Sequence, residues 1–472
     1  MLLHAMFDIS TPPPPPHHHH HNDNSSSITI SSRQRPNFIS RFILGPSFAE
    51  AELTNLSATL SSLPEKAADA LLSGFLACSG RFFSLVYHQG NYSDGESGTE
   101  TGTGMKEHEG GDYYAYSAKA VRGLRGLELG LGGDLATGIG KRERERKRKK
   151  QQQGRGDNVA VVASADLVLA LVLGLGVVTF DLLDSGLHAH SICRYTLGLV
   201  SRPSVGLDSD YDGGGGGGRG GEFESQLLPL IHMDSCNCLV RRQVPAYRLR
   251  PRRPEGVDRY IGLCVSLLPV VYDLCCVSSR LGGVDDGSGV LTAGKSYEED
   301  DGLSGVETAV RNWSPSLRKE DAAKLTPTEI QVIVTQATVY QTAVLLFIHR
   351  LRFPFGVEDE MATSMAASIL DDVRSLYHAP GHRGSEAGRD QNSIPFEYRM
   401  GLPFLIAAAE LQDGIQRTQA LELLDWVVWK RMYPRVGDLL RRFVLYVWEA
   451  RDRGWQGHWV DLTARGPQFV LF

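Results

Sequence analysis

Apolar side chains recur at every third or fourth position through several segments of this 472-residue chain. That spacing keeps one face of an α-helix away from water, so each segment predicts an amphipathic helix. The first run follows Pro64, and the second lies within residues 113–131. The apolar positions are Ala68, Leu71, Leu72, Phe75, Phe82 and Val86 in the first run, and Tyr113, Tyr116, Ala120, Leu124, Leu127 and Leu131 in the second.

A capping box marks the start of another helix. Thr326 is followed by Pro327, at the first helical position, and by Glu329, whose carboxylate can reach back to the helix start. The helix is predicted to end near Arg350, and we expect Leu345 to be buried on most sides, so that Leu345→Asp unfolds the domain. Its predicted buried stripe is Ile330, Val334, Ala337, Val344 and Ile348. Further helices are predicted over residues 358–377, 415–432 and 436–453.

Strand patterns are scarce in this sequence. Sustained alternation of apolar and polar residues is rare, and no Asn-Gly or Asp-Gly turn joins two candidate strands. The predicted fold is therefore all-α, an antiparallel helical array with long disordered low-complexity insertions. A Pro, His and Ser-rich leader over residues 1–40 is predicted to be disordered, and one helical domain is expected over 45–472. Its predicted disordered loops lie at about residues 91–111, 132–157, 204–224, 282–304 and 379–393.

Composition narrows the class of protein. The apolar fraction of 42% is enough for a substantial core, and the formal net charge of −6 lacks the basic excess typical of proteins that grip phosphates. The seven cysteines are odd in number, irregularly spaced and without a C-x-x-C pair, so neither a disulfide framework nor a cysteine-rich zinc site is expected. The N-terminus also lacks the pattern of a secretory signal.

The most apolar stretch, residues 159–180, raises the alternative of a membrane anchor. Asp166 interrupts it and leaves the fourteen largely apolar residues 167–180. A helix of that length covers about 21 Å, which is short of the roughly 30 Å hydrocarbon core of a bilayer. The sequence therefore favours a helix buried in a bundle and no membrane contact, with a membrane-associated protein as the alternative.

Motifs for catalysis or cofactor binding are weak. Gly174 and Gly176 give part of a dinucleotide fingerprint, but they fall inside an apolar helix, where close helix packing explains them better. His188 and His190 could form a ligand pair, yet no partner ligand stands at a recognisable spacing, so a pair on the helix surface is expected. No G-x-S-x-G, Walker or H-E-x-x-H motif is present. We therefore expect no enzyme activity, no cofactor and no metal site.

A basic block is the one candidate functional segment. Residues 141–150 hold eight basic side chains and two acidic ones. Such a block in an exposed loop is typical of a nuclear-import signal, although a solvated charged linker has the same composition. The candidate import residues are Lys141, Arg142, Arg144, Arg146, Lys147, Arg148, Lys149 and Lys150.

The order of the apolar blocks resembles the fungal-specific transcription factor domain, the helical region downstream of the zinc binuclear cluster in many fungal regulators. The blocks are ALLSGFLACSGRFFSLV (70–86), YYAYSAKAVRGL (113–124), VASADLVLALVLGL (162–175), LLDSGLHAHSICRYTLGLV (182–200), ATVYQTAVLLFIHRL (337–351), LPFLIAAAELQDGIQRTQALELLDWV (402–427) and VLYVWEARDRGWQGHW (444–459). The phrases IHRL and PFLIAAAE carry the most specific part of this resemblance. No cysteine precedes Cys78, so the six-cysteine zinc cluster of such regulators is missing here.

The resemblance implies a nuclear, non-enzymatic transcription regulator. Its expected partners are other transcription regulators or a second copy of itself, together with an unidentified small-molecule effector. Direct DNA binding by this chain is not supported, because neither the charge nor a zinc cluster provides for it. The alternatives are a membrane-associated protein anchored by residues 159–180 and an α-helical scaffold protein.

Overall fold

The computed structural model describes residues 65–90, 111–132, 156–201, 221–251, 256–258, 260–281, 301–378, 399–428 and 433–472. Every regular element within these ranges is a helix, and the only bridge between extended residues joins Asp258 to Gly262. The predicted all-α fold is confirmed. The leader over residues 1–40 and the basic block at 141–150 lie outside the described residues.

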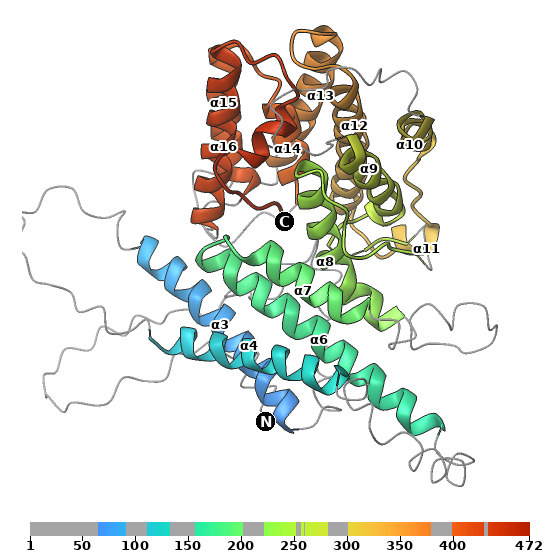
Figure 1. Ribbon diagram of the computed structural model, residues 1–472, viewed down its shortest axis with the longest axis vertical. Helices are drawn as coiled ribbons and strands as arrows, with labels where there is room; N and C mark the ends of the chain where they lie inside the picture. The colour runs from blue at the N-terminus through green and yellow to red at the C-terminus, as the bar shows by residue number, and fades with distance from the viewer. Residues whose placement is uncertain are drawn as a thin grey trace, which may run out of the picture.

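Four helices form a layer at one end of the molecule, here called the N-terminal layer (Figure 1). They are α3 (Glu65–Gly90), α4 (Gly111–Gly132), α6 (Gly156–Asp184) and α7 (Ala189–Val200). Helices α3 and α4 pack together against α6, and α7 packs along α6 and against α8. The apolar faces predicted for α3 and α4 are buried at Leu71, Ala120 and Leu124, whereas Tyr116 is exposed.

Helix α8 (Gly221–Val240) lies between this layer and the rest of the molecule. Every residue from Leu227 to Val240 is buried, because α6, α7 and α9 pack around the helix. Such an environment suits an evenly apolar helix, yet α8 carries polar side chains on several faces. Those polar groups are His232, Asp234, Ser235 and Asn237. Burial of a polar group without a hydrogen-bond partner is costly, and His232, Asp234 and Asn237 each have one among the described residues.

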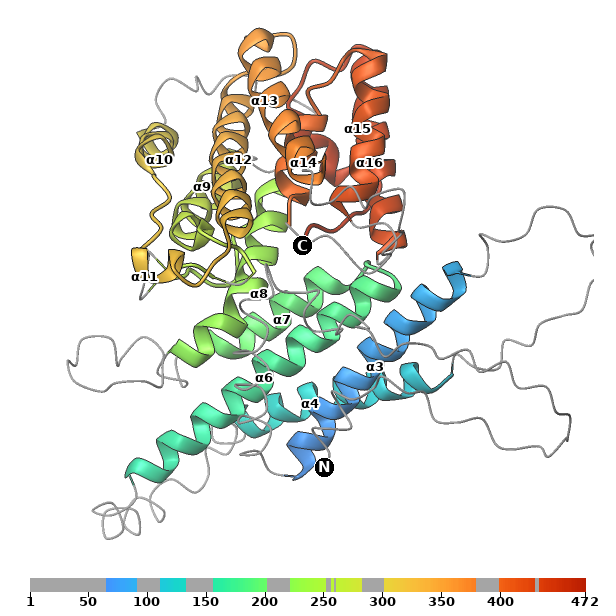
Figure 2. The same ribbon diagram turned by 180° about the vertical axis from the view of Figure 1, so that it is seen from behind.

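The remaining helices form the C-terminal body, seen from both sides in Figures 1 and 2. They are η3 (Cys264–Leu267), α9 (Leu268–Leu281), α10 (Asp301–Asn312), α11 (Lys319–Ala322), α12 (Pro327–Arg352), α13 (Asp359–His378), α14 (Gly401–Ala408), α15 (Gly414–Val427), α16 (Pro434–Asp452) and η5 (Trp459–Ala464). Helix α12 packs against α10, α13 and α14. The chain ends between the body and the N-terminal layer, where Phe469 to Phe472 are buried.

The predicted capping box of α12 is confirmed. The Glu329 amide donates to the Thr326 hydroxyl, and the Thr326 amide donates to the Glu329 carboxylate at 2.8 Å. The predicted buried stripe was partly wrong, because Val334 is 40% exposed. Leu345 was also misplaced: it is half-buried, whereas its neighbour Leu346 is fully buried. The helix is covered on adjacent sides rather than along one stripe, so a single 3.6-residue face underestimates its buried surface.

A buried ionic network ties α12 to the start of α13, to the turn after α14 and to α16. The Arg350 guanidinium donates to both carboxylate oxygens of Glu410, at 2.9 and 2.6 Å, and to Asp359 at 2.7 Å. Arg451 completes the network by donating to Asp359 at 3.2 Å and to the backbone oxygen of Glu410 at 2.7 Å. Arg350 belongs to the IHRL phrase and Glu410 to the PFLIAAAE phrase. The two most specific phrases of the sequence therefore meet at one buried ion pair.

The segment proposed as a membrane anchor, residues 159–180, lies in α6. From Leu167 onward, most of its described apolar side chains are buried against α3, α4 and α7. Two other stretches among the described residues, Cys264–Leu281 and Pro327–Arg352, are long and apolar enough to cross a membrane by length and composition. Half or more of each is already buried inside the protein, as expected of core helices.

Some helix boundaries differ from the sequence prediction. Helix α15 ends at Val427, before the predicted end at residue 432, and α13 and α16 begin and end within two residues of their predicted limits. Helices α8 and α10 begin at Gly221 and Asp301, inside ranges predicted as loops. Glycine and aspartate are common in loops, but they are also accepted in the first turn of a helix, where backbone N–H groups are unpaired.

Candidate functional site

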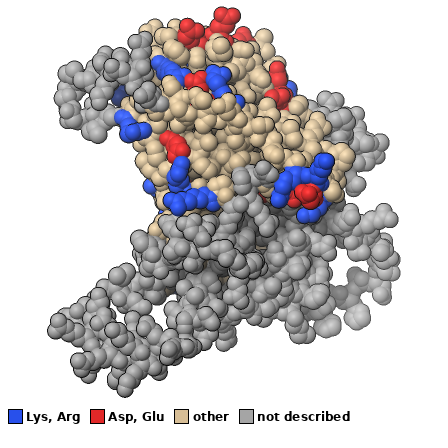
Figure 3. Space-filling view, turned by 90° about the vertical axis from the view of Figure 1, so that its right-hand side faces the viewer, with Lys and Arg blue, Asp and Glu red and all other residues tan. Residues whose placement is uncertain are grey.

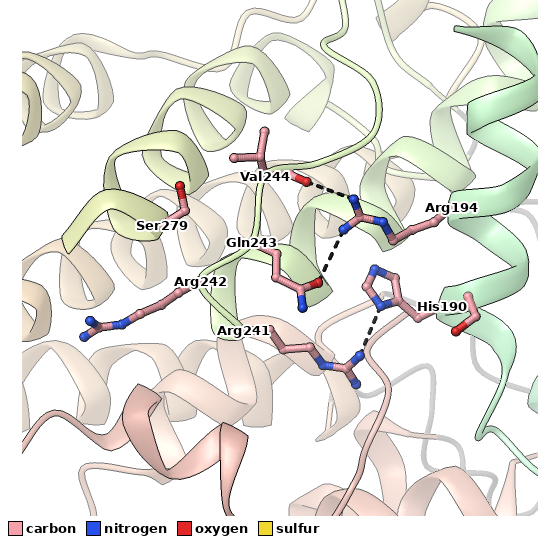
Figure 4. A pocket seen from close by; sticks show the side chains of 8 residues that line it. His190, Arg194, Arg241, Arg242, Gln243, Val244 and Ser279 are labelled. Atoms are coloured by element: carbon pink, nitrogen blue, oxygen red, sulfur yellow. Dashed lines mark hydrogen bonds between the residues drawn. The ribbon is translucent and has the colours of Figure 1, made fainter. Parts of the chain in front are cut away.

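A hollow of about 560 Å³ opens where α7, the end of α8 and the end of α9 meet. It is lined by His190, Ser191, Arg194, Arg241, Arg242, Gln243, Val244 and Ser279, and we call it the arginine pocket (Figure 4). Three of these residues carry a permanent positive charge and none carries a carboxylate. The pocket is therefore a candidate site for an anion.

The end of α8 places two arginines in succession at the pocket. The Arg242 amide donates to the Leu239 oxygen, and the Gln243 amide donates to the Cys238 oxygen at 2.9 Å. This pair of bonds is the Schellman arrangement that closes a helix, and it needs a left-handed residue at the position of Arg242. Its φ is 52°, where glycine is usual. The chain accepts this strained conformation, of order 1 kcal/mol or more, at a residue that lines the pocket.

Arg194 projects from α7 across the pocket toward the end of α8. Its guanidinium donates to the side-chain oxygen of Gln243 at 3.3 Å and to the backbone oxygen of Val244 at 3.2 Å. It also lies 3.9 Å from the Asp234 carboxylate. Arg194 therefore joins the N-terminal layer to the segment that follows α8.

At the pocket wall, the hydrogen bonds of His190 determine which of its two ring nitrogens carries the proton. The Arg241 guanidinium donates to Nδ1 of His190 at 3.1 Å, so that nitrogen is an acceptor. Nε2 must then carry the proton and donate to Asp234 at 3.0 Å. Burial lowers the pKa of His190, and this outweighs the Asp234 hydrogen bond. His190 is therefore a neutral imidazole between Arg241 and Asp234.

Asp234 anchors this network from inside α8. One of its oxygens accepts from His190 and the Cys238 thiol, and the other accepts from the Ala246 amide at 2.6 Å. Burial alone raises the pKa of Asp234, but the hydrogen bonds from His190 and the Ala246 amide lower it below its usual value. Asp234 therefore stays ionised and balances one of the pocket arginines.

The side chains of His190, Asp234 and Cys238 lie close enough together, within 4.8 Å, to be considered as metal ligands. Their surroundings do not fit a divalent cation. The Arg194 guanidinium lies 3.1 Å from the Cys238 sulfur, and burial raises the pKa of that thiol. Metal binding would require a thiolate and a bare Nε2 on His190, which is the opposite of the observed arrangement.

The histidine pair was misplaced by the sequence interpretation. His188 is exposed at the start of α7, but His190 is buried and bonded to Asp234. A partner 44 positions away cannot be recognised from local spacing. The three pocket arginines were missed as well. The adjacent pair Arg241-Arg242, directly after a buried helix, was the signal that could have found them.

The comparison with protein families decides the identity. A family model described as the fungal specific transcription factor domain matches residues 222–472, more than half of the chain. The chain belongs to this family. Comparison with curated proteins gives no match, and neither does comparison with solved structures. The family groups regulatory domains of transcription factors and is not an enzyme family, which agrees with the resemblance seen in the sequence.

The match covers α8 and the whole C-terminal body. It includes the last three blocks that carry the resemblance, and the four earlier blocks precede it. Arg241, Arg242 and Ser279 of the pocket lie within the matched range, whereas His190 and Arg194 come from α7, before it. The arginine pocket therefore lies where the family domain meets the N-terminal layer.

Proposed function

We propose that this protein is a nuclear regulator of transcription that acts through partners and responds to a small-molecule effector. The observation that carries the proposal is the family match over residues 222–472. Helices packed by apolar faces can adopt alternative arrangements, and a ligand that prefers one of them shifts the population. The partners we propose are other transcription regulators or a second copy of the chain.

Surface charge supports action through partners rather than through direct contact with DNA. On the face shown in Figure 3, basic and acidic side chains are interspersed and no continuous basic stripe is visible. Arginines of the described residues are often paired with acids on the surface, as in Arg318 with Asp321 and Arg311 with Glu307. A protein that binds DNA through its phosphates needs a basic excess on one face.

A tethering experiment tests the regulatory role. The whole chain is fused to an unrelated DNA-binding domain, and transcription of a reporter carrying its site is compared with that from the DNA-binding domain alone. We expect a change in reporter output, in either direction. A second fusion that carries the exposed substitution Glu449→Gln controls for the effect of a surface substitution, and it should give the same output as the parent fusion. Unchanged output from a fusion present in the nucleus would contradict the proposal.

The basic block at residues 141–150 is proposed as the import signal, on its composition alone. In a fluorescent fusion of the whole chain, deletion of residues 141–150 should move the protein from the nucleus to the cytoplasm. Deletion of residues 95–104, which removes the same length of a Gly and Thr-containing segment, should leave it in the nucleus. Equal nuclear accumulation of both variants would exclude this block as the signal.

A further inference from the structure

We propose that the arginine pocket binds a small organic anion, a carboxylate or a phosphate monoester, between Arg194 and Arg241. The further statement that this anion is the effector rests on the proposed regulatory function. Arg194 and Arg241 point to the same side of the pocket with His190 and Gln243 between them, while Arg242 extends the other way (Figure 4). The two guanidinium groups lie on either side of His190 and Gln243 and offer positive charge to an acidic group at the pocket from two sides.

The charges of the site leave one positive charge uncompensated. In the described part of the chain, the carboxylates paired with the three pocket arginines are Asp234, beside Arg194, and Asp461, which lies 3.2 Å from Arg242. Arg241 lies over the Phe469 ring and is held by His190 and the Phe469 backbone oxygen, neither of which is charged. Three guanidinium groups against two carboxylates call for one more anion.

Arg241 is held in place and keeps donors for a ligand, whereas Arg194 already donates to Cys238, Gln243 and Val244 and contributes mainly its charge. Arg241 gives one N–H group to His190 and another to the Phe469 oxygen, out of the five that a guanidinium carries. Burial lowers the pKa of Arg241, so desolvation already opposes its charge. An anion whose oxygens accept hydrogen bonds from the remaining N–H groups of Arg241 would offset the cost of desolvating the guanidinium.

The start of α7 also lies at the pocket. His190 and Ser191 are the second and third residues of this 12-residue helix and also line the pocket. The helix begins without a side-chain cap and has no acidic residue in its first turn. No acid of α7 itself faces this end, but the Asp181 carboxylate accepts from the amide of the N-cap residue His188 at 2.9 Å, so the helix end adds little to the charge of the arginines.

The remaining lining defines the size and nature of the ligand. About 560 Å³ lies within the range of sites that hold metabolite-sized molecules. Ser279 offers a hydroxyl group and Val244, 42% exposed, offers an apolar surface beside the charged groups. These fit an organic anion better than inorganic phosphate alone. Because α7 belongs to the N-terminal layer and Arg241 to the family domain, such a ligand would hold the two together.

Binding is tested on the purified full chain by thermal unfolding and by calorimetry. The probes are citrate and 2-oxoglutarate as carboxylates, glucose 6-phosphate as a phosphate monoester, and inorganic phosphate and potassium chloride at equal ionic strength. We expect at least one organic anion to raise the unfolding midpoint with increasing concentration, beyond the effect of potassium chloride. The carboxylate and phosphate arms identify which acidic group is preferred. If no organic anion exceeds potassium chloride, the proposal is wrong.

Ser191→Asp places a negative charge at the pocket without removing any of the contacts described above. At the third position of α7 an acid favours the helix, so this variant should fold at least as well as the parent protein. It should weaken anion binding about tenfold or more by like-charge repulsion. Thr328→Asp, an exposed position in the first turn of α12 away from the pocket, is the matched control and should bind as the parent does.

Equal binding by Ser191→Asp and Thr328→Asp would exclude this pocket as the site. Because binding is measured on the purified chain, the result does not depend on the reporter assay. A protein that binds the anion without changing reporter output would contradict the proposed regulatory function and leave the site intact. Reporter activity without anion binding would contradict the site alone.

Discussion

The N-terminal layer and the C-terminal body are both built from packed helices, but they fill their interiors differently. Between α3, α4, α6 and α7 lies a cluster whose buried side chains are all alanine, leucine or valine. A glycine also allows α6 to approach α7 closely, since a Cβ on Gly174 would lie 2.3 Å from the Thr196 side chain. The layer buries a few polar side chains, such as Ser73, Thr196 and His190, whereas α8 and the body bury more such groups, including an ion pair. Those of α8 and the body include His232, Asp234, Asn237, Gln336, Arg350 and Glu410.

This difference determines how strictly each interior constrains the residues at its buried positions. Apolar faces accept many substitutions of similar volume, whereas a buried ion pair or amide requires a particular partner at a particular place. Asn237, for example, donates to the Leu471 backbone oxygen and accepts from the Leu471 amide, which fixes the last residues against α8. The family match begins at residue 222, at the helix where this polar interior begins.

The largest effect of a single change is expected inside the body. Leu346→Asp should abolish cooperative unfolding, because it buries an unpaired charge at a fully buried position of α12. Leu345→Asp should cost less, since Leu345 is half-buried and its charge can reach water. Circular dichroism during urea denaturation measures both. Equal loss of structure in the two variants would show that the exposed side of α12 is not exposed in solution.

The buried ion pair provides the next test of the comparison. Glu410→Gln leaves the Arg350 charge with only the half-buried Asp359 as a counterion, and should lower the free energy of unfolding by about 3–5 kcal/mol. Glu449→Gln removes a carboxylate from the exposed pair with Arg453 and should cost less than about 1 kcal/mol. The two values come from urea denaturation. Equal losses of unfolding free energy in the two variants would mean that the buried ion pair contributes no more to the stability of the body than an exposed pair does.

Much of the fold could be predicted from local sequence, because helix periodicity and capping act over a few residues. The capping box at Thr326 needs only a residue three positions away, and its prediction was confirmed. Burial around α12 was harder, since Val334 and Leu345 carry apolar side chains yet face outward or lie half-covered. Which sides of a helix are covered depends on neighbours such as α10 and α14, which the local pattern does not contain.

The candidate site could not be predicted for the same reason, at longer range. Arg194 and Arg241 are 47 positions apart in the sequence, and His190 finds its carboxylate on another helix. The sequence predicted that His188 and His190 lie on a helix surface, because no partner for either histidine could be recognised. Only the packing of α7 on α8 brings these groups together. Sequence reasoning identified the basic residues of the linear block at 141–150, but not those that the fold assembles.

A matched pair of glycines tests the close packing of the N-terminal layer. Gly174→Ala should destabilise the protein by about 1–3 kcal/mol, because the new methyl group would overlap the buried Thr196 side chain. Gly176→Ala meets nothing within 4 Å and should be neutral or stabilising by up to about 1 kcal/mol, as alanine favours a helix. Thermal unfolding measures the pair. The sequence treated both glycines alike, so similar midpoints would favour the sequence interpretation over the structural one.

The buried polar interior also predicts a dependence of stability on pH. His232 is fully buried in α8, and burial together with the Arg399 charge lowers its pKa to about 3. Tyr340 donates its hydroxyl proton to the Arg399 oxygen, so His232 donates through Nε2 and its Nδ1 has no partner in the described structure. A proton added at Nδ1 would be a buried, unpaired charge.

Below about pH 6.5 His232 is protonated in the unfolded chain but remains neutral in the folded chain, whose His232 pKa is lower. The stability from this group is therefore complete above pH 6.5 and falls as the pH drops toward 3, by about 1.4 kcal/mol per pH unit. His232→Gln keeps a donor for Tyr340 and should reduce the slope of unfolding free energy between pH 5.5 and 4.5 by about that amount, whatever it does to stability at pH 7.5. Met361→Gln, at an exposed position of α13 and without a titrating group, should leave the slope as it is. A slope that His232→Gln does not change would mean that α8 opens to water. The contrast between the apolar cluster of the N-terminal layer and the buried polar groups of α8 and the body would then fail at α8.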